Sequence, residues 1–294
     1  LDNYKLVDQF IYPEYLCGFF DADGSIYISK NTLFISFTQC VLNVLILIQK
    51  EFGGTIFKRN SRNNKQRDQY TLRIVGLNCK KILNVLNEGS ILKINKVQYA
   101  MEFIEMINKK ITETKTNLID LIRNNTKIDD ITYFNRVNWK YIAGFFDGDG
   151  CITLNYSDLK CNRLSIMFSI SQKYTPNFLK YLQIYIRDDI KNNVSLSKLH
   201  IAVCKKDALR KIYEKIKNYI IVKKFQYDTI IKILDEYSKI ENKDFVIAML
   251  HTVSKKDIET SSGASNGAKN FHYSSIFKMC VMDECHHLSS EMFS

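Results

Sequence analysis

The chain has 294 residues, 46% of them apolar, and its 42 Lys and Arg outnumber its 31 Asp and Glu to give a formal net charge of +11. This length and composition fit one or two folded domains and exclude an intrinsically disordered chain. No apolar run approaches the ~20 residues of a membrane-spanning helix. The basic excess fits either a polyanionic partner or a solubilising surface.

The first half predicts helices and strands in a fixed order. An apolar helix ends at Gly24, and alternating residues at 25–30 and 33–39 predict a hairpin. A helix over 41–52 stops at a Gly pair. A second hairpin pairs 55–59 with 69–75 around a polar loop, and helices follow at 78–86 and 95–109.

The second half repeats this order. Strands are predicted at 151–156 and 164–171, and a helix runs from Pro176 to residue 187, with Pro in its first turn. A tight hairpin at 194–197 and 200–203 precedes helices at 206–218 and 224–239. Because the strands lie grouped between helices, each unit reads αββαββα, and we predict an α+β fold with antiparallel sheets.

These units divide the chain into four expected parts. They are a first repeat at 1–110, a polar and partly helical linker at 111–138, a second repeat at 139–240 and a C-terminal tail at 241–294.

Each unit opens with a near-copy of one segment. The copies are Leu16-Cys17-Gly18-Phe19-Phe20-Asp21-Ala22-Asp23-Gly24-Ser25-Ile26 and Ile142-Ala143-Gly144-Phe145-Phe146-Asp147-Gly148-Asp149-Gly150-Cys151-Ile152. Two copies indicate an internal duplication. Gly costs about 1 kcal/mol against Ala inside a helix, so Gly18 and Gly144 need a reason. Close packing of the two helices supplies one, and a bent core helix is the alternative.

The doubled motif resembles that of the LAGLIDADG homing endonucleases, in the single-chain form with two motifs. The matching letters are Gly18-Phe19-Phe20-Asp21, Asp23-Gly24 and Ile26, with their counterparts in the second copy, and the resemblance covers residues 8–240. It implies two pseudo-symmetric αββαββα units with saddle-like sheets. It also implies that the two motif helices pack side by side between the halves.

By this resemblance, Asp23 and Asp149 are the catalytic, metal-binding residues, and the carbonyls of Ala22 and Gly148 assist. Two carboxylates brought close repel each other unless divalent cations lie between them. Oxygen ligands suit Mg²⁺, or another divalent cation such as Mn²⁺, and Mg²⁺ takes phosphate oxygens as further ligands. Such ions activate water for phosphodiester hydrolysis. Capping of a helix-to-strand turn is the alternative role for these aspartates.

The second acidic pair, Asp21 and Asp147, is expected to support the turn or the helix interface instead of binding metal. The five histidines lie outside the motifs, and no Ser/His/Asp arrangement supports covalent catalysis. Water activated by metal is therefore the expected nucleophile.

Two further positions recur in both units. Gln39 and Gln172 end the second strand of each unit, and the resemblance implies that they orient metal-bound water; a polar strand end is the alternative. It also implies a lysine near the scissile phosphate, at Lys96 and Lys224. Lys223 competes with Lys224, and a solvated helix start is the alternative.

The DNA-reading surface is expected on the exposed faces of the four hairpins, because a curved antiparallel sheet can enter the major groove. Basic side chains there read guanine or neutralise phosphate, and the sequence does not separate the two roles. Solvated strand faces are the alternative. The expected residues are Lys30, Lys58, Arg59, Arg62, Lys65, Arg67 and Arg73 in the first unit, and Lys160, Arg163 and Lys198 in the second.

The tail does not fit the repeat. Residues 260–270 are rich in Ser, Gly and Asn and read as a linker. An apolar run then ends in Asp-Glu-Cys-His at 283–286 and resembles motif II of helicase-type ATPases, but the chain has no phosphate loop, so we expect no ATPase activity. The alternatives are flanking host sequence, an appended tail, and a zinc cluster of Cys280, Cys285, His286 and His287.

We therefore predict a monomeric, site-specific endonuclease that cuts both strands of DNA by metal-dependent hydrolysis. The alternative is an RNA-binding intron maturase of the same fold, with intron RNA as partner; the two retained acidic centres favour cleavage. An intein-borne endonuclease ranks last, because splicing blocks are absent.

Composition also suggests a setting for the protein. Eight scattered cysteines without a CxxC pair indicate a reducing compartment, and the first residues show no signal pattern. We expect an intracellular protein that makes no membrane contact. Heavy use of Ile, Lys and Asn suggests an AT-rich genome, such as that of a mitochondrion.

Overall fold

The computed structural model describes residues 10–59, 68–109, 115–124, 127–157, 163–173 and 175–237. The helicase-like segment and the cysteine–histidine set of the tail lie outside these residues, as do four of the expected DNA contacts, Arg62, Lys65, Arg67 and Lys160.

The first unit begins with the motif helix α1 (Pro13–Asp23), which leads directly into β1 (Gly24–Ser29) and β2 (Thr32–Gln39). Helix α2 (Leu42–Phe52), strands β3 (Thr55–Arg59) and β4 (Gln69–Val75), and helices α3 (Cys79–Gly89) and α4 (Ile94–Lys109) follow. The antiparallel sheet has the order β1-β2-β4-β3. The two-residue turn between β1 and β2 holds Lys30 and Asn31 at φ of 46° and 59°, the left-handed geometry of tight hairpins.

The second unit has the same order. Helix α6 (Trp139–Asp149) leads into β5 (Gly150–Ser157) and β6 (Arg163–Ser171), then α7 (Pro176–Ile190), β7 (Ser195–Leu196), β8 (His200–Val203), α8 (Lys206–Ile216) and α9 (Lys224–Tyr237). Its antiparallel sheet, β5-β6-β8-β7, has the topology of the first. The connection between the units contains α5 (Lys115–Asn124) and a 3₁₀ turn over Ile131–Arg136.

The predicted α+β fold of two antiparallel units is confirmed, with small shifts at element ends. Helix α3 extends to Gly89 and α7 to Ile190, beyond the predicted residues 86 and 187. The α7 extension places Ile190 in the core, because its side chain is buried, whereas α3 gains only Asn87, Glu88 and Gly89 beyond its predicted end. Continued burial along one helix face therefore accounts for the end of α7.

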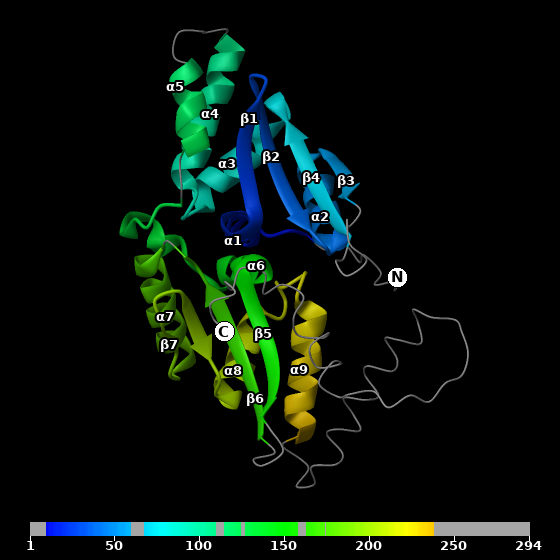
Figure 1. The fold of residues 1–294 in the computed structure, drawn as a ribbon, viewed down its shortest axis with the longest axis vertical. Coiled ribbons are helices and arrows are strands. Elements are labelled where there is room, and N and C mark those ends of the chain that lie inside the picture. The colour runs from blue at the N-terminus through cyan, green and yellow to red at the C-terminus, as the bar shows by residue number, and fades with distance from the viewer. Residues whose placement is uncertain are drawn as a thin grey trace, which may run out of the picture.

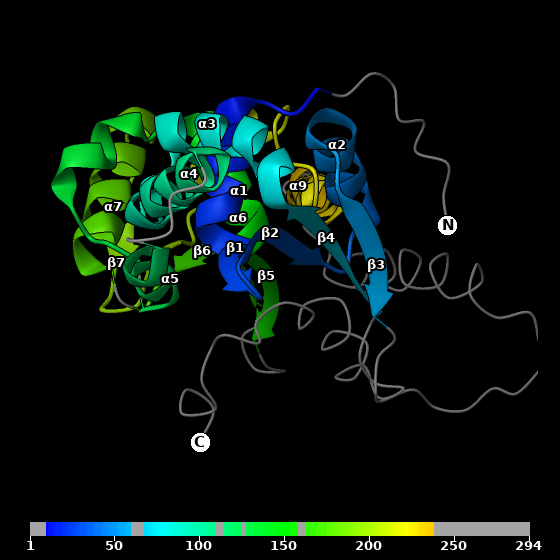
Figure 2. The ribbon, with the colours of Figure 1, turned by 90° about the horizontal axis from the view of Figure 1, so that it is seen from above.

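The two units meet at their motif helices. In Figure 1 the units lie one above the other, with α1 and α6 side by side at the centre. Figure 2 shows helices α2, α3 and α4 toward one side of the molecule and strands β1, β3 and β5 toward the other. No helix among the described residues is long and apolar enough to cross a membrane.

Alternating burial gives each sheet two different faces. In β2, Leu33, Ile35 and Phe37 are fully buried against the helices, while Phe34 is only partly buried. Alternate side chains along a strand point to opposite faces. We call the face opposite the helices the open face of each sheet.

Candidate active site at the paired motif helices

The motif helices touch backbone to backbone. A Cβ atom built on Gly18 would lie 2.0 Å from the carbonyl oxygen of Tyr141, and one on Gly144 would lie 1.9 Å from that of Tyr15. No side chain fits at either position. The predicted close packing is therefore confirmed, and it explains why glycine is used inside both helices.

The first aspartate of each motif, Asp21 or Asp147, is fully buried, and we call these two residues the anchors. Asp21 accepts hydrogen bonds of 2.6–3.1 Å from the hydroxyl of Ser90 and the backbone N–H groups of Ile91, Leu92 and Lys93. Asp147 accepts equivalent bonds of 2.7–3.0 Å from the N–H groups of Ile221, Val222 and Lys223. Each carboxylate fixes the segment before the last helix of its own unit, which agrees with the expected supporting role.

Each anchor also bonds to the opposite helix. The hydroxyl of Tyr141 donates to Asp21 at 2.7 Å, and that of Tyr15 donates to Asp147 at 2.6 Å. Burial raises the pKa of both tyrosines well above their usual value, so the hydroxyls remain protonated donors. The two crossed bonds set the register of one motif helix against the other.

Two lysines cover the carbonyl groups at the ends of the motif helices. The ammonium group of Lys93 donates to the carbonyls of Phe20, Ala22 and Gly24 at 2.6–3.2 Å. That of Lys223 donates to Phe146, Asp147 and Gly148 at 2.6–3.2 Å. Helix C-termini leave such carbonyls without partners and carry partial negative charge, which a cation compensates.

The lysines at the helix ends are thus Lys93 and Lys223, whereas Lys96 and Lys224 are the two predicted near the scissile phosphate. Because Asp21 and Asp147 bind the backbone of Lys93 and Lys223, these side chains return to the helix ends. Lys224 points away and donates to the carbonyl of Lys217 at 2.6 Å. Lys96 lies farther along, in α4, where burial lowers its pKa. Of the two lysines considered for the second unit, Lys223 is the one that contacts the motif helix, and the residue near the scissile phosphate stays a prediction.

The second aspartate of each motif, Asp23 or Asp149, is the last residue of its helix and lies beside a glutamine. The side-chain amide of Gln39 donates to Asp23, and that of Gln172 donates to the Oδ2 atom of Asp149. The structure thus brings together in each unit the two residue types that the sequence singled out.

The two helix ends converge. A Cβ atom on Gly148, in the second motif, would lie 3.3 Å from the Oδ2 atom of Asp23, in the first. Asp23 and Asp149 are also both close enough to Lys93 to raise its pKa. Burial and the nearby charge of Lys127 outweigh them and lower the pKa of Lys93 to about 7. A carboxylate of each unit therefore contributes to one region of the surface.

Family comparisons match both units. A family model described as LAGLIDADG endonuclease matches residues 142–249, and one described as LAGLIDADG-like domain matches residues 11–84. The chain belongs to the LAGLIDADG homing endonuclease family, in its two-motif, single-chain form. The matched ranges contain both copies of the motif.

Two curated relatives are similar in sequence. One is a probable intron-encoded endonuclease 4 of Neurospora crassa, 27% identical over 172 residues, covering 56% of this chain and 29% of the relative. The other is a probable intron-encoded endonuclease aI3 of Dictyostelium citrinum, 26% identical over 227 residues, covering 71% of this chain and 88% of the relative. The chain thus spans less than a third of the first relative and most of the second.

Solved structures of meganucleases share the fold. One is the LAGLIDADG meganuclease I-CpaMI bound to uncleaved DNA, with a TM-score of 0.63, 17% identity and coverage of 86% of this chain and 100% of that one. Another is I-SmaMI bound to an uncleaved DNA target in the presence of calcium ions, with a TM-score of 0.60, 18% identity and coverage of 78% and 92%.

The open face of the first LAGLIDADG unit carries a row of aromatic side chains around Arg73. Tyr27 and Phe34 stack with ring centroids 5.1 Å apart. The Arg73 guanidinium carbon lies 5.7 Å from the Phe34 centroid and 5.3 Å from that of Phe57, which is 47% exposed. We call Tyr27, Phe34, Arg73 and Phe57 the aromatic row. Sequence reasoning named only the arginine.

The other expected basic contacts occupy different places. Lys30 lies in the β1–β2 turn and Lys198 between β7 and β8, both exposed. Arg59 follows the open-face alternation of Phe57 in β3, whereas Lys58 points to the opposite face and pairs with Asp68 at 2.7 Å. Arg163 begins β6. Adjacent residues of a strand face opposite ways, so Lys58 and Arg59 cannot both line the open face.

The open face of the second unit has a different chemistry. Its described positions carry small or flexible side chains, among them Thr153, Ser165, Met167 and Ser169. The two LAGLIDADG units therefore share topology but present unlike surfaces.

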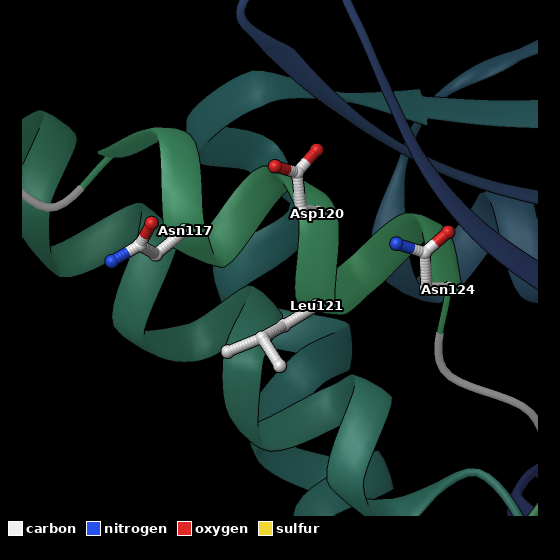
Figure 3. Close-up of a pocket in the computed structure, with 4 residues that line it drawn as sticks. All are labelled: Asn117, Asp120, Leu121 and Asn124. Carbon is white, nitrogen blue, oxygen red and sulfur yellow. The ribbon is translucent and has the colours of Figure 1, made fainter.

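A surface pocket lies away from the motif residues. Asn117, Asp120, Leu121 and Asn124 line it, and Figure 3 shows that all four come from one helix, α5. None of the motif aspartates, glutamines or lysines lines this pocket, so we do not assign catalysis to it.

Proposed function

We propose that the protein is a site-specific endonuclease that hydrolyses both strands of a DNA duplex with divalent metal ions. The observation that carries this proposal is the pairing of Asp23 and Asp149 at the converging ends of two helices, each with a glutamine amide beside it. One carboxylate per strand suits a double-strand cut within a single chain, so we propose that the protein acts as a monomer.

The residues at this centre fit a hard divalent cation. Asp23 and Asp149 supply carboxylate oxygens, and Mg²⁺ typically takes one or two carboxylates, waters and substrate phosphates. No group of three or more His, Cys, Asp or Glu side chains forms a metal cage within the described residues. Phosphate and water oxygens would therefore complete the coordination. The carbonyls of Ala22 and Gly148, proposed as further ligands, currently accept from Lys93 and Lys223.

The metal would lower the pKa of a bound water and stabilise the leaving oxygen. The chain's own residues have other tasks. Gln39 and Gln172 orient the carboxylates and, in our proposal, the attacking water. Lys223 places positive charge where a phosphate would approach, and Lys93 does so in its protonated form; such preorganised charge stabilises a transition state.

The proposed DNA surface is formed by the two open faces. Basic side chains neutralise phosphates, whereas contacts to base edges in the major groove select the sequence. The aromatic row gives the first unit apolar surface for thymine methyl groups and an arginine for guanine. Lys30, Arg59, Arg163 and Lys198 are proposed as further contacts.

The setting of the protein remains a proposal from composition. The scattered cysteines favour an intracellular protein, and the Ile-, Lys- and Asn-rich sequence favours an AT-rich genome, such as that of a mitochondrion. The boundaries 1–110, 111–138, 139–240 and 241–294 are likewise proposed.

A supercoiled plasmid tests the nuclease proposal. It would carry the joined sequences that flank the gene and be incubated with the protein and Mg²⁺. We expect linear product, abolished in the Asp23→Asn/Asp149→Asn double variant and retained in Asp120→Asn, a matched change on the surface of α5. Intact plasmid together with faster splicing of the surrounding intron would reject cleavage in favour of the maturase function.

A further inference from the structure

A histidine lies close to the Asp149–Gln172 pair, on the open face of the second sheet. His200 begins β8 and is the register partner of Ser171, the residue directly before Gln172. Register partners share one face of an antiparallel sheet, and alternation along β6 places Ser171 on the open face. The backbone N–H group of Gln172 donates to the carbonyl of Leu199 at 2.8 Å. His200 is therefore fixed next to the strand end that carries the glutamine.

A serine at the end of the neighbouring strand holds the imidazole ring. Ser197 follows β7 and lies opposite His200, since its backbone N–H group donates to the carbonyl of His200 at 2.8 Å. The hydroxyl oxygen of Ser197 lies 2.8 Å from the Nδ1 atom of the ring. It also accepts from the backbone N–H groups of Leu199 and His200, at 3.3 and 3.2 Å. The turn fixes the hydroxyl, and the hydroxyl fixes the ring.

These contacts decide which ring nitrogen carries the proton. A hydroxyl oxygen has two lone pairs and one proton, and two backbone N–H groups already use the lone pairs of Ser197. Its proton can reach Nδ1 at 2.8 Å or the His200 carbonyl at 3.2 Å, and that carbonyl already accepts the N–H group of Ser197. The hydroxyl therefore donates to Nδ1, and the neutral ring carries its proton on Nε2.

The corresponding position of the first unit has a different chemistry. Thr71 is the register partner of Thr38, the residue before Gln39, and the two threonine hydroxyl oxygens lie 2.9 Å apart. A hydroxyl can donate or accept, so it suits either kind of base edge. An Nε2–H group can only donate. The two units therefore present unlike hydrogen-bonding groups next to their glutamines.

We propose that His200 is a specificity-determining residue whose Nε2–H group donates to a guanine close to the cleavage site. The inference rests on the proposed nuclease function and adds one base contact to it. In the major groove guanine presents two acceptors, N7 and O6, whereas cytosine presents an amino donor. A fixed, uncharged donor therefore favours guanine and disfavours cytosine. Lys198, exposed in the same turn, supplies charge for a neighbouring phosphate.

The first test determines the tautomer without DNA. Long-range proton–nitrogen correlation spectra of the full chain, in alkaline buffer where imidazoles are neutral, distinguish the two tautomers. The His200→Gln variant identifies the His200 signals among those of the five histidines. We expect the Nε2–H form in the parent protein and in Ser197→Thr, and a larger share of the Nδ1–H form in Ser197→Ala. An Nδ1–H form in the parent protein, or no change in Ser197→Ala, would overturn the proposal.

The second test measures base preference by competition binding. The joined sequences that flank the gene would be varied one base pair at a time, without Mg²⁺, so that binding is measured apart from cleavage. At one position guanine should bind about threefold to tenfold more tightly than cytosine, the net effect of one hydrogen bond. His200→Gln should change the preferred base there to adenine, because a glutamine amide matches adenine N6 and N7. His200→Phe should abolish the preference.

Lys198→Ala is the matched control in the same turn. It should weaken the binding of all targets alike and keep the preferred base, because a phosphate contact carries no sequence information. The same base preference in the parent protein and in His200→Gln would overturn the inference while leaving the nuclease proposal intact. No binding of any target by the parent protein would reject the proposed function, and this base contact with it.

Discussion

The hydroxyl of Tyr15, in the first motif helix, donates to the carboxylate of Asp147, in the second, at 2.6 Å. Asp147 also accepts three backbone N–H groups from the segment that carries Lys223. One buried carboxylate therefore joins the helix interface to the segment that supplies a lysine to the candidate centre. Tyr141 and Asp21 form the mirror arrangement. Changes at the interface should consequently affect the centre as well as stability.

Replacing Tyr15 with Phe tests the crossed bonds. The variant keeps the ring but removes one donor from a buried carboxylate, so we expect unfolding free energy to fall by about 1–3 kcal/mol. Urea denaturation followed by circular dichroism measures it. Tyr141→Phe should give a similar loss. Tyr12→Phe, on the surface, should stay within about 0.5 kcal/mol of the parent, and an equal loss there would disprove a specific role.

Gly144→Ala tests the backbone contact between the motif helices. The new methyl group would meet the backbone of Tyr15, which cannot move aside as a flexible side chain can, so we expect a loss of more than about 3 kcal/mol or failure to fold. Gly76→Ala is the control. Its φ of 61° disfavours alanine, but its Cβ atom would meet nothing within 4 Å. A smaller loss of about 1–2 kcal/mol is expected there, by thermal melting.

Lys223→Met tests the role of the lysines at the helix ends. Losing a positioned charge at the reacting phosphate should reduce cleavage at least about 100-fold while DNA affinity changes much less. Single-turnover cleavage and fluorescence anisotropy measure the two quantities. Lys224→Met is the adjacent control, since Lys224 donates to Lys217 instead. A larger effect at Lys224 would favour Lys224, the residue predicted from the sequence, over Lys223 as the lysine near the phosphate.

Arg73→Ala tests the aromatic row. Losing a guanidinium held between two rings should weaken binding of the DNA target by about 1–3 kcal/mol and relax base preference at one position. Competition binding against a library of single-base variants would measure both effects. Lys58→Ala, on the opposite face of the same sheet, should change affinity by less than about 0.5 kcal/mol. Uniform weakening across all sequences would make Arg73 a phosphate contact.

The duplicated pattern carried most of what could be predicted from sequence. Alternation and glycine positions gave the two αββαββα units, and the resemblance of the doubled motif to a known family singled out Asp23, Asp149 and both glutamines. Lys223 was named only as a competitor of Lys224, and Lys93 was not named, because helix starts are poorly defined by sequence. A comparison of Ile91-Leu92-Lys93 with Ile221-Val222-Lys223 would have found both lysines, since both runs place a lysine after two apolar residues.

Other features left no comparable sequence signal. Lys127 lies in the connection, which has no second copy to compare, and only the folded contacts of Ile128 and Asp129 bring it to Asp149. Lys58 was assigned to the open face because it is basic, although strand alternation sends it to the other side. Charge alone does not define a surface, because side-chain direction depends on strand register.

The backbone contact between the motif helices at Gly18 and Gly144 has a consequence for how such proteins diversify. Since two backbones in contact leave no room for adjustment, the spacing between the units is fixed, while each open face is free to change. Hybrids that exchange whole units between relatives should therefore assemble when both partners retain the small residues and the tyrosine–aspartate crossing. Such hybrids would inherit one recognition preference from each parent.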